Sequence, residues 1–422
     1  MLHSYKYKNV LSFNQEAEFT MYAPATRVKS RFPNNYVEEK NGCNILKTAV
    51  IVGENAGGKT NFVKSLLYLR SFFADSDNVS AQKSKVNSNN LLEGCPKKDN
   101  TQQEFEIQVS GEEGKIYTYT LVIDWIGIVE ERLCFRKNRT AKDILTFEMK
   151  RTSSRMECDL HDGECDKGKC APETELAYHA VIPGISAEIK EALLDAVKNT
   201  DSVGLFAAKM ALMGNRNCIE FMSIIKNSIC PETCPLNYDF YLSVKEEKNY
   251  QDILKKKEYF EIFRMVDYSI YKVEVDDEKP FTDSIIYRKR KDGSSFARRL
   301  RADSSGVREF FAWAIQIYRV IYENKTVIAD EMDRVLNPIL SDRVISYING
   351  KKHAGQFIFT SHNILHLDLK NYMKEQIYFV TKDVENLESE LYSLADFPEV
   401  RYDTSKIYEF YMKGILGGTA IE

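Results

Sequence analysis

The sequence predicts an α/β protein with a mixed, largely parallel sheet and flanking helices. Three short apolar runs, at residues 45–52, 326–329 and 356–359, support this prediction, because strands buried on both faces of a parallel sheet have this composition. The first run is followed by a glycine-rich turn and then by apolar residues at helical spacing, which are Phe62, Val63, Leu66, Leu67 and Phe72. A strand, a tight turn and a helix in this order are typical of α/β folds.

The glycine-rich turn matches the phosphate-loop pattern G-x-x-x-x-G-K-[ST] at every fixed position. Its residues are Gly53, Glu54, Asn55, Ala56, Gly57, Gly58, Lys59 and Thr60. The glycines let backbone N–H groups surround a phosphate chain, and the helix that follows directs its positive end toward it. Four fixed positions coincide by chance in roughly one or two per cent of chains this long. The turn therefore predicts nucleotide binding.

Individual residues of this turn have separate expected roles. Lys59 is expected to contact the β- and γ-phosphate oxygens, and the Thr60 hydroxyl is expected to complete the ligand shell of a Mg²⁺ ion. Asn61, the next residue, is included among the nucleotide-binding residues.

The two other apolar runs end in residues that suit phosphate chemistry. Asp330 and Glu331 follow the run 326–329, and we expect Asp330 to hold Mg²⁺ while Glu331 polarises the attacking water as general base. His362 follows the run 356–359 and two hydroxyl residues, and its imidazole is expected to contact the γ-phosphate. Ligands bind at the carboxyl ends of parallel strands, so these side chains should share one site.

A second anion site is predicted at Ser304, Ser305 and Gly306, which precede a helix bearing Phe310, Phe311, Ala314, Ile317 and Ile321. Hydroxyl groups, free N–H groups and the helix dipole converge at such a position. Two anion sites far apart in one sequence suggest two molecules that face each other, each contacting the other's γ-phosphate.

Taken together, these motifs resemble the ABC-type ATPase heads of the Rad50/SMC/OLD group. The likeness is greatest to compact bacterial "AAA family" ATP-binding proteins of abortive-infection and antiphage loci, the RloA and AriA types. The similarity runs nearly end to end and includes Asn9 to Phe13 (N-x-x-S-F), GENAGGKT, DSSG, IADEMD, TSH and the closing YEFYMKGILGG. It implies Gly53–Thr60 as Walker A, Ser304–Gly306 as signature, Asp330 and Glu331 as Walker B, and His362 as switch histidine.

The resemblance also implies biological expectations. It suggests a homo-oligomer built from head-to-head dimers, a sensor role in antiphage defence triggered by DNA or a phage protein, and a separate effector such as a TOPRIM-like nuclease. Two departures affect details of nucleotide sensing. Related chains commonly have S-L-H-P where this chain has Val335-Leu336-Asn337-Pro338, and the Q-loop glutamine has only Gln102 and Gln103 as candidates.

Composition limits the class of protein. The chain has 422 residues, 43% hydrophobic and 28% charged, with a net charge of −4, so it is not a polycation that coats nucleic acid. No apolar run approaches the length of a membrane span, and the N-terminus lacks the apolar core of a signal peptide. We expect a cytoplasmic protein with no membrane contact, whose nine cysteines are thiols.

Four ranges are expected along the chain. Residues 1–75 form the N-terminal part of the head, 76–175 a β-rich lobe with a polar loop, 176–283 a helical insertion, and 284–422 the C-terminal part of the head. Within the β-rich lobe, a structural Zn²⁺ site and an acidic loop with scattered thiols are alternative interpretations of four residues, Cys158, His161, Cys165 and Cys170. Cys230 and Cys234 are a second, weaker pair.

A hairpin is predicted in which Ile285, Ile286 and Tyr287 pair against Phe296. The fourteen residues 288–301 carry seven cations, Arg288, Lys289, Arg290, Lys291, Arg298, Arg299 and Arg301. These form either a solvated face or a patch for a phosphate backbone.

Three function classes compete. The first is a dimerising ATPase that controls an effector, with a DNA-repair or SMC-like DNA-binding ATPase as its variant. The second is an AAA+ remodeller, whose acidic motif would lie much closer to the phosphate loop and which would lack Ser-Ser-Gly. The third is a small-molecule kinase or transport ATPase subunit, and a kinase would gain nothing from a signature motif supplied by another chain. The sequence favours the first class.

Overall fold

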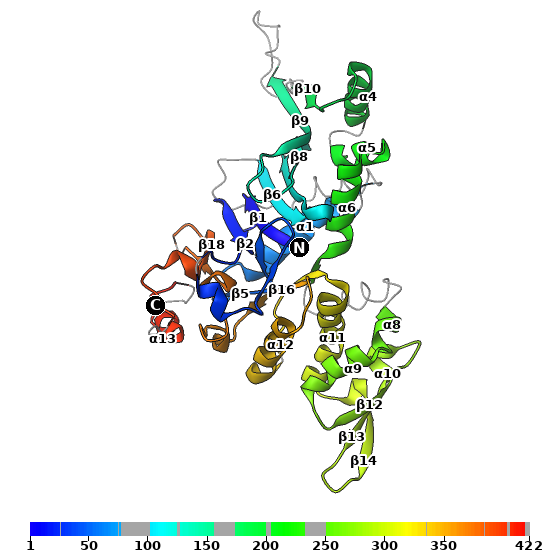
Figure 1. The fold of residues 1–422 in the computed structure, drawn as a ribbon, viewed down its shortest axis with the longest axis vertical. Coiled ribbons are helices and arrows are strands. Elements are labelled where there is room, and N and C mark those ends of the chain that lie inside the picture. Colours follow the sequence, from blue (N-terminus) through cyan, green and yellow to red (C-terminus); the bar gives the residue numbers. More distant parts are fainter. Residues whose placement is uncertain are drawn as a thin grey trace, which may run out of the picture.

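The computed structural model describes residues 1–25, 27–74, 76, 102–124, 127–155, 174–199, 204–232, 250–334, 336–383, 385–402 and 406–417. All statements about structure below concern these residues. The predicted fold class is confirmed, because the chain is a mixed α/β protein whose central sheet is largely parallel (Figure 1).

The central sheet has six strands in the order β11-β15-β16-β5-β17-β18. The first five are mutually parallel, and β18 pairs antiparallel with β17. The strands are β11 (Ile229–Glu232), β15 (Thr326–Ala329), β16 (Gln356–Ser361), β5 (Thr48–Gly53), β17 (Ile377–Lys382) and β18 (Ser389–Ser393). Every residue of β5, β15 and β16 is buried, which matches their apolar composition.

Alternate residues of β5 enter two different cores. Ala49 and Ile51 join the core that contains α1 (Lys59–Ala74), whereas Val50 and Val52 join the core that contains α11 (Ser305–Glu323) and α12 (Pro338–Gly350). Helices therefore cover both faces of the sheet, and β5 is fixed from both sides.

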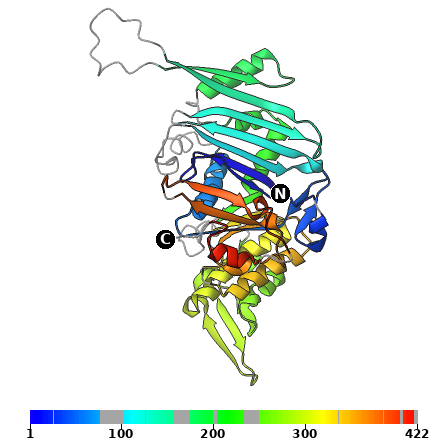
Figure 2. The same ribbon diagram turned by 90° about the vertical axis from the view of Figure 1, so that its left-hand side faces the viewer.

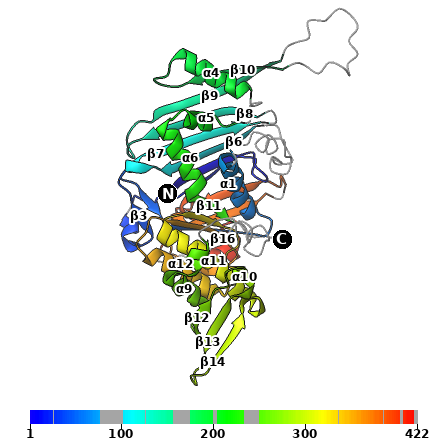
Figure 3. The same cartoon turned by 90° about the vertical axis from the view of Figure 1, so that its right-hand side faces the viewer.

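A second sheet has seven antiparallel strands in the order β10-β9-β8-β7-β6-β1-β2. The strands are β1 (Leu2–Lys8), β2 (Ala17–Thr20), β6 (Gln103–Ser110), β7 (Ile116–Ile123), β8 (Ile128–Arg136), β9 (Ile144–Arg155) and β10 (Thr174–Val181). Strands from the expected ranges 1–75 and 76–175 thus share one sheet. Figures 2 and 3 show this sheet at one end of the molecule, on the far side of α1 from the central sheet.

Three helices accompany this β-rich lobe: α4 (Ala187–Lys198), α5 (Phe206–Leu212) and α6 (Arg216–Ser228). The buried Glu131 carboxylate of β8 anchors α5, because it accepts hydrogen bonds from the backbone N–H groups of Phe206 and Ala207. Burial raises the pKa of Glu131 to about 7. The docking of α5 thus depends on a hydrogen-bonded acid inside the lobe.

The opposite end of the molecule carries a small lobe (Figure 1). Its helices are α8 (Tyr250–Leu254), α9 (Lys257–Phe263) and α10 (Pro280–Asp283), and its antiparallel sheet consists of β12 (Ile270–Glu274), β13 (Ile285–Lys289) and β14 (Ser295–Arg299). The remaining elements are the short pair β3 (Tyr36–Glu38) and β4 (Asn44–Leu46), and α13 (Ile407–Met412). The predicted hairpin at 285–296 is confirmed, since β13 and β14 pair across it.

Among the described helices, none is both long and apolar enough to span a bilayer. Four cysteines lie in the described part of the chain, Cys43, Cys134, Cys218 and Cys230, and all four are buried. Cys43, Cys134 and Cys218 are free thiols, as predicted. Cys234 lies outside the described residues, so its suggested pairing with Cys230 stays a prediction.

We expect Phe62→Ala in α1 to destabilise the protein by about 3–5 kcal/mol, the usual cost of truncating a buried aromatic side chain. Phe62 is fully buried and its ring contacts Tyr5, Tyr7 and Phe19, so it joins α1 to the antiparallel sheet. The control is Leu67→Ala on the same helix, where the side chain is 39% exposed. Urea denaturation should separate the two variants, and equal midpoints would contradict the role of Phe62.

Candidate nucleotide site

Eight of the predicted site residues line one cavity at the carboxyl ends of β5, β15 and β16. The cavity measures about 310 Å³. Its lining consists of Asn55, Ala56, Gly58, Lys59, Thr60, Asn61, Glu331 and His362. The structure thus gathers residues that lie about 300 positions apart in sequence, at the edge of a parallel sheet where ligands bind.

Close backbone packing explains the glycines of the loop. A Cβ atom on Gly53 would lie 2.2 Å from the carbonyl oxygen of Val380 in β17. Gly58 has φ +122°, and a Cβ atom there would lie 2.6 Å from Ser389 Oγ. A larger residue at either position would push the loop away from the neighbouring strands. Ala56, with φ +61°, is held in the left-handed region as well.

The side chain of Lys59 is hydrogen-bonded to the backbone of the loop. Its Nζ donates hydrogen bonds to the carbonyl oxygens of Gly53, at 2.9 Å, and Glu54, at 2.8 Å, and the residue is 5% exposed. Burial lowers the pKa of Lys59, while Glu331, Asp330 and Glu54 act in the opposite direction. The cation therefore lies among carboxylates inside the site, where a phosphate chain would provide a stronger counter-charge.

Two serines that the motif analysis did not single out hold the loop in place. Ser389 Oγ lies 2.6 Å from the carbonyl oxygen of Gly57 and 2.7 Å from Ser12 Oγ. Ser12 Oγ also accepts a hydrogen bond from Asn61 Nδ2 at 2.8 Å, and its carbonyl accepts from Ser389 N. Ser12 lies inside the N-x-x-S-F motif, so this turn supports the phosphate loop.

The two acidic residues after β15 are fixed by Thr360 of β16. The Thr360 hydroxyl donates to Asp330 Oδ1 at 2.7 Å and accepts from the backbone N–H of Glu331 at 2.8 Å. Asp330 is 6% exposed, whereas Glu331 is half-buried at the cavity wall. Glu331 has φ +49°, which is uncommon for a residue with a side chain and marks a locally constrained backbone.

The oxygen donors at the site suit Mg²⁺. Mg²⁺ is usually held by one or two protein oxygens together with substrate phosphates and water. Thr60 and the Asp330 carboxylate offer such oxygens beside Lys59. Among the described residues, no cluster of three or more His, Cys, Asp and Glu side chains could hold a metal alone. A Mg²⁺ ion here would therefore depend on the nucleotide for its remaining ligands.

His362 follows β16 and lines the cavity together with the phosphate loop. Its pKa is lowered by burial and by the nearby Lys59 cation, while the carboxylates of Glu331, Asp333 and Asp330 oppose this change. These effects favour the neutral form of the imidazole. Its backbone is positioned by Ser361, whose hydroxyl donates to Asp333 Oδ2 and accepts from Asn363 N.

The signature residues do not line this cavity. Ser304 caps α11 by accepting a hydrogen bond from Val307 N at 3.4 Å, and Ser304 and Ser305 are exposed. Arg288 of β13 contacts the residue that precedes them. It donates hydrogen bonds to Asp267 Oδ2 and Asp303 Oδ2, both at 2.7 Å. Asp303 Oδ1 in turn accepts from Ser304 N. The signature turn is therefore rigidly attached to β13 and open to solvent.

The basic hairpin differs from the expectation of seven available cations. Arg288 is 7% exposed and engaged by two carboxylates, so it belongs to the interior. Arg299 and Arg301 both lie 3.6 Å from Asp283 Oδ1, which offsets part of their charge. Fewer cations of the hairpin face solvent than the sequence suggests. The length of a basic run in the sequence does not reveal acidic partners that come from other segments.

The two Q-loop candidates lie away from the cavity. Gln103 is 3% exposed and donates from Nε2 to the carbonyl of Asn9, while the Gln102 carbonyl accepts from Asn9 Nδ2. Neither is among the residues that line the cavity. Both glutamines stabilise the N-terminal turn instead. The four suggested zinc ligands, Cys158, His161, Cys165 and Cys170, lie outside the described residues, so zinc binding stays a prediction.

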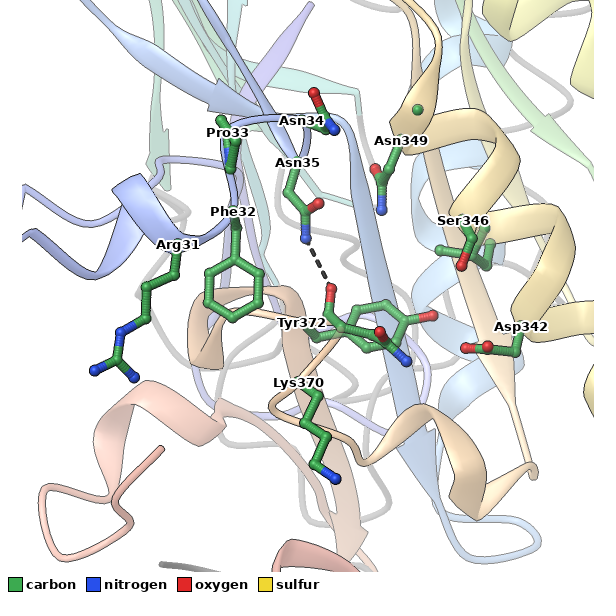
Figure 4. Close-up of a pocket in the computed structure, with 13 residues that line it drawn as sticks. Arg31, Phe32, Pro33, Asn34, Asn35, Asp342, Ser346, Asn349, Lys370 and Tyr372 are labelled. Carbon is green, nitrogen blue, oxygen red and sulfur yellow. Dashed lines mark hydrogen bonds between the residues drawn. The ribbon is translucent and has the colours of Figure 1, made fainter. Parts of the chain in front are cut away.

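A separate cavity of about 220 Å³ lies between α12 and the segment 31–35 (Figure 4). Asn35 Nδ2 donates there to the carbonyl of Asn371, and Thr48 Oγ1, at the start of β5, donates to Asn349 Oδ1. This cavity therefore lies at the amino ends of the parallel strands, and none of the predicted site residues lines it.

No family model matches the chain, and no curated protein matches it. Among solved structures, it is similar to an SMC head bound to the C-winged helix domain of ScpA, at 14% identity and TM-score 0.44, over 93% of this chain and 97% of that one. It is also similar to the SMC head domain from Thermotoga maritima, at 12% identity and TM-score 0.41, over 93% and 98%. The SMC head with coiled coil and joint from Pyrococcus yayanosii matches at 12% identity and TM-score 0.45, over 99% of each chain.

We expect Thr360→Val to slow ATP hydrolysis by about tenfold or more, because unsatisfied buried polar groups cost about 1–3 kcal/mol each. The variant removes the shared partner of Asp330 and the Glu331 N–H. Thr360→Ser keeps the hydroxyl and should retain most activity. Steady-state kinetics at saturating ATP tests this, and equal rates for the valine and serine variants would contradict the role of the hydroxyl.

The imidazole of His362 should titrate below its ordinary pKa of 6.5 in the free protein, because burial and Lys59 disfavour the cation. Added ATP should raise that pKa, since the phosphate charges stabilise imidazolium. NMR titration of the imidazole resonances, assigned with His362→Gln, measures both values. A pKa above 6.5 in the free protein, or no rise on ATP addition, would contradict the placement of His362 beside the phosphates.

Proposed function

We propose that this protein is an ABC-type ATPase that binds ATP with Mg²⁺ and hydrolyses it in a site completed by a second copy of the chain. The observation that carries the proposal is the single cavity that joins Lys59 and Thr60 to Glu331 and His362. A phosphate-loop lysine, a carboxylate and an imidazole around one small polar cavity fit the in-line attack of water on a γ-phosphate.

In this proposal each residue of the site has a separate role. Lys59 and the loop N–H groups bind the phosphates, Thr60 and Asp330 hold Mg²⁺, and Glu331 accepts a proton from the attacking water. His362 donates a hydrogen bond to a γ-phosphate oxygen. Mg²⁺, when bound, supplies additional neutralisation of the phosphate charge.

A second copy is proposed to supply the signature. Ser304 and Ser305 are exposed at the amino end of α11, and no signature residue lines the cavity of its own chain. An uncovered helix N-terminus with two hydroxyl residues suits an anion that arrives from outside. Head-to-head dimerisation would place it against the partner's γ-phosphate.

The motif resemblance supports a more specific role. We propose that nucleotide-driven dimerisation acts as a sensor in bacterial antiphage defence, in the cytoplasm, and controls a separate effector such as a TOPRIM-like nuclease. Genomic neighbourhood tests this part, because an adjacent nuclease gene is expected. A gene that has no adjacent nuclease gene and lies beside repair or chromosome-segregation genes would favour an SMC-like DNA-binding ATPase instead.

That variant, an SMC-like DNA-binding ATPase, is favoured by one observation. Lys289, Arg290 and Lys291 are exposed at the tip of the β13–β14 hairpin, Arg298 is exposed near its base, and Arg290 stacks on Phe296 at 5.2 Å. Such exposed cations suit a phosphate backbone.

Glu331→Gln should bind ATP but hydrolyse it at least about a hundredfold more slowly, because it lacks the general base. Lys59→Ala should instead lose ATP binding. Fluorescent nucleotide titration and phosphate release distinguish the two defects. Near-normal turnover in Glu331→Gln would remove Glu331 from the base role and contradict the proposed function.

Mixing two inactive variants tests the composite site. Ser305→Arg blocks the signature but leaves the phosphate loop intact, whereas Lys59→Ala does the reverse. A mixed dimer contains one complete site, so ATPase activity should reappear on mixing. Differently tagged chains establish that subunits exchange. Mixed dimers that form and stay inactive would mean either that the two sites are obligately coupled or that the signature does not act in the partner's site.

A further inference from the structure

An arginine next to the catalytic carboxylate connects two parts of the proposed site. Arg334 lies three residues after Glu331, in a turn closed by a hydrogen bond from Arg334 N to the Glu331 carbonyl. Its Nη2 lies 3.4 Å from Glu309 Oε1, and its Nε lies 4.0 Å from Glu331 Oε2. One guanidinium therefore serves two carboxylates from different elements.

Glu309 belongs to α11, the helix that begins at the signature. It lies four residues after Ser305, which places it about one turn into the helix and on the same face. The two residues are thus parts of one rigid unit, and a shift of the signature turn would be transmitted to Glu309. Since α11 extends through Glu323 and is largely buried, the helix would move as a body.

Among the described residues, Arg334 makes the ion pair with Glu309, and Arg308 of the same helix is a second nearby cation. The Glu309 side chain is fully buried, and within the described part of the chain its Oε2 atom has no hydrogen-bond partner. Burial raises the pKa of Glu309, while Arg334 acts to lower it. A buried carboxylate that loses its cation is costly, so Arg334 is expected to follow Glu309 when α11 moves.

Glu331, by contrast, holds Arg334 only at the limit of an ion pair and has a constrained backbone with φ +49°. A small displacement of Arg334 therefore changes how strongly the guanidinium orients the Glu331 carboxylate. The two distances, 3.4 Å and 4.0 Å, indicate that the arginine is closer to the helix partner than to the base.

We propose that Arg334 is a positioning residue that couples the signature end of α11 to the catalytic carboxylate Glu331 of the same chain. A signature that engages a phosphate on the partner then adjusts the base of its own chain, so the two sites of a dimer act together. This inference rests on the proposed ATPase function.

The test is a double-mutant cycle in the full-length protein. Arg334→Gln and Glu309→Gln should each lower kcat about tenfold with KM and the affinity for a non-hydrolysable ATP analogue unchanged. The double variant should lose no more than either single variant, because both changes break one connection. Arg334→Lys keeps a cation and should recover part of the rate.

Arg343→Gln is the matched control, since Arg343 is an exposed arginine of α12 that stacks on Tyr268 at 5.3 Å. Its kinetics should match those of the wild type. Thermal unfolding of each variant verifies folding, and Arg334→Lys and Glu309→Gln carry the test if Arg334→Gln fails to fold.

Any of three results would overturn the proposal. They are a wild-type kcat in Arg334→Gln, fully additive losses in the double variant, and a rise in KM instead of a fall in kcat. Those outcomes leave the ATPase function intact. A wild-type protein that does not hydrolyse ATP would contradict the proposed function and this inference together.

Discussion

The parallel pairing of β5 with β16 and β17 is the constraint on which the rest of the site depends. It places Gly53 against the carbonyl of Val380, at a separation that leaves no room for a Cβ atom. It also aligns Val52 with Ser361, so that the phosphate loop and His362 leave the sheet at the same edge. The cavity exists because these strand ends coincide.

Supporting contacts around this edge come from distant segments. Ser12 near the N-terminus and Ser389 in β18 contact the phosphate loop, and Thr360 holds both acidic residues after β15. Each is a hydrogen bond to the backbone or side chain of a residue that would touch the nucleotide. Positioning by such contacts is what gives a phosphoryl-transfer site its preorganisation.

Two separate sets of ion pairs connect the amino end of α11 to its surroundings. Arg288 connects β13 to Asp303, which precedes α11, and Arg334 connects Glu309 of α11 to the segment after β15. The hairpin and the proposed general base Glu331 are therefore both connected to the same end of one helix. In the proposed dimer, this arrangement relates partner contact to hydrolysis.

The sequence predicts those features that depend on local chemistry. Gly53, Gly58 and Lys59 were identifiable because a phosphate loop imposes fixed spacing, and Glu331 and His362 because they follow buried apolar strands. Thr360 belongs to the T-S-H motif, but its contacts with Asp330 and Glu331 were not predictable from it, and Ser389 and Arg334 could not be singled out. Their roles arise only when strands and helices far apart in sequence meet. Arg288 illustrates the same limit: it belongs to a basic run in the sequence, but two acidic residues from other segments bury it.

The most direct test of the central claim is a structure of Glu331→Gln with ATP and Mg²⁺ bound. The account predicts a dimer in which the γ-phosphate contacts Lys59 and His362 of one chain and Ser305 of the other. A γ-phosphate that contacts Lys59 and Ser305 of the same chain, or ATP bound away from this cavity, would contradict it.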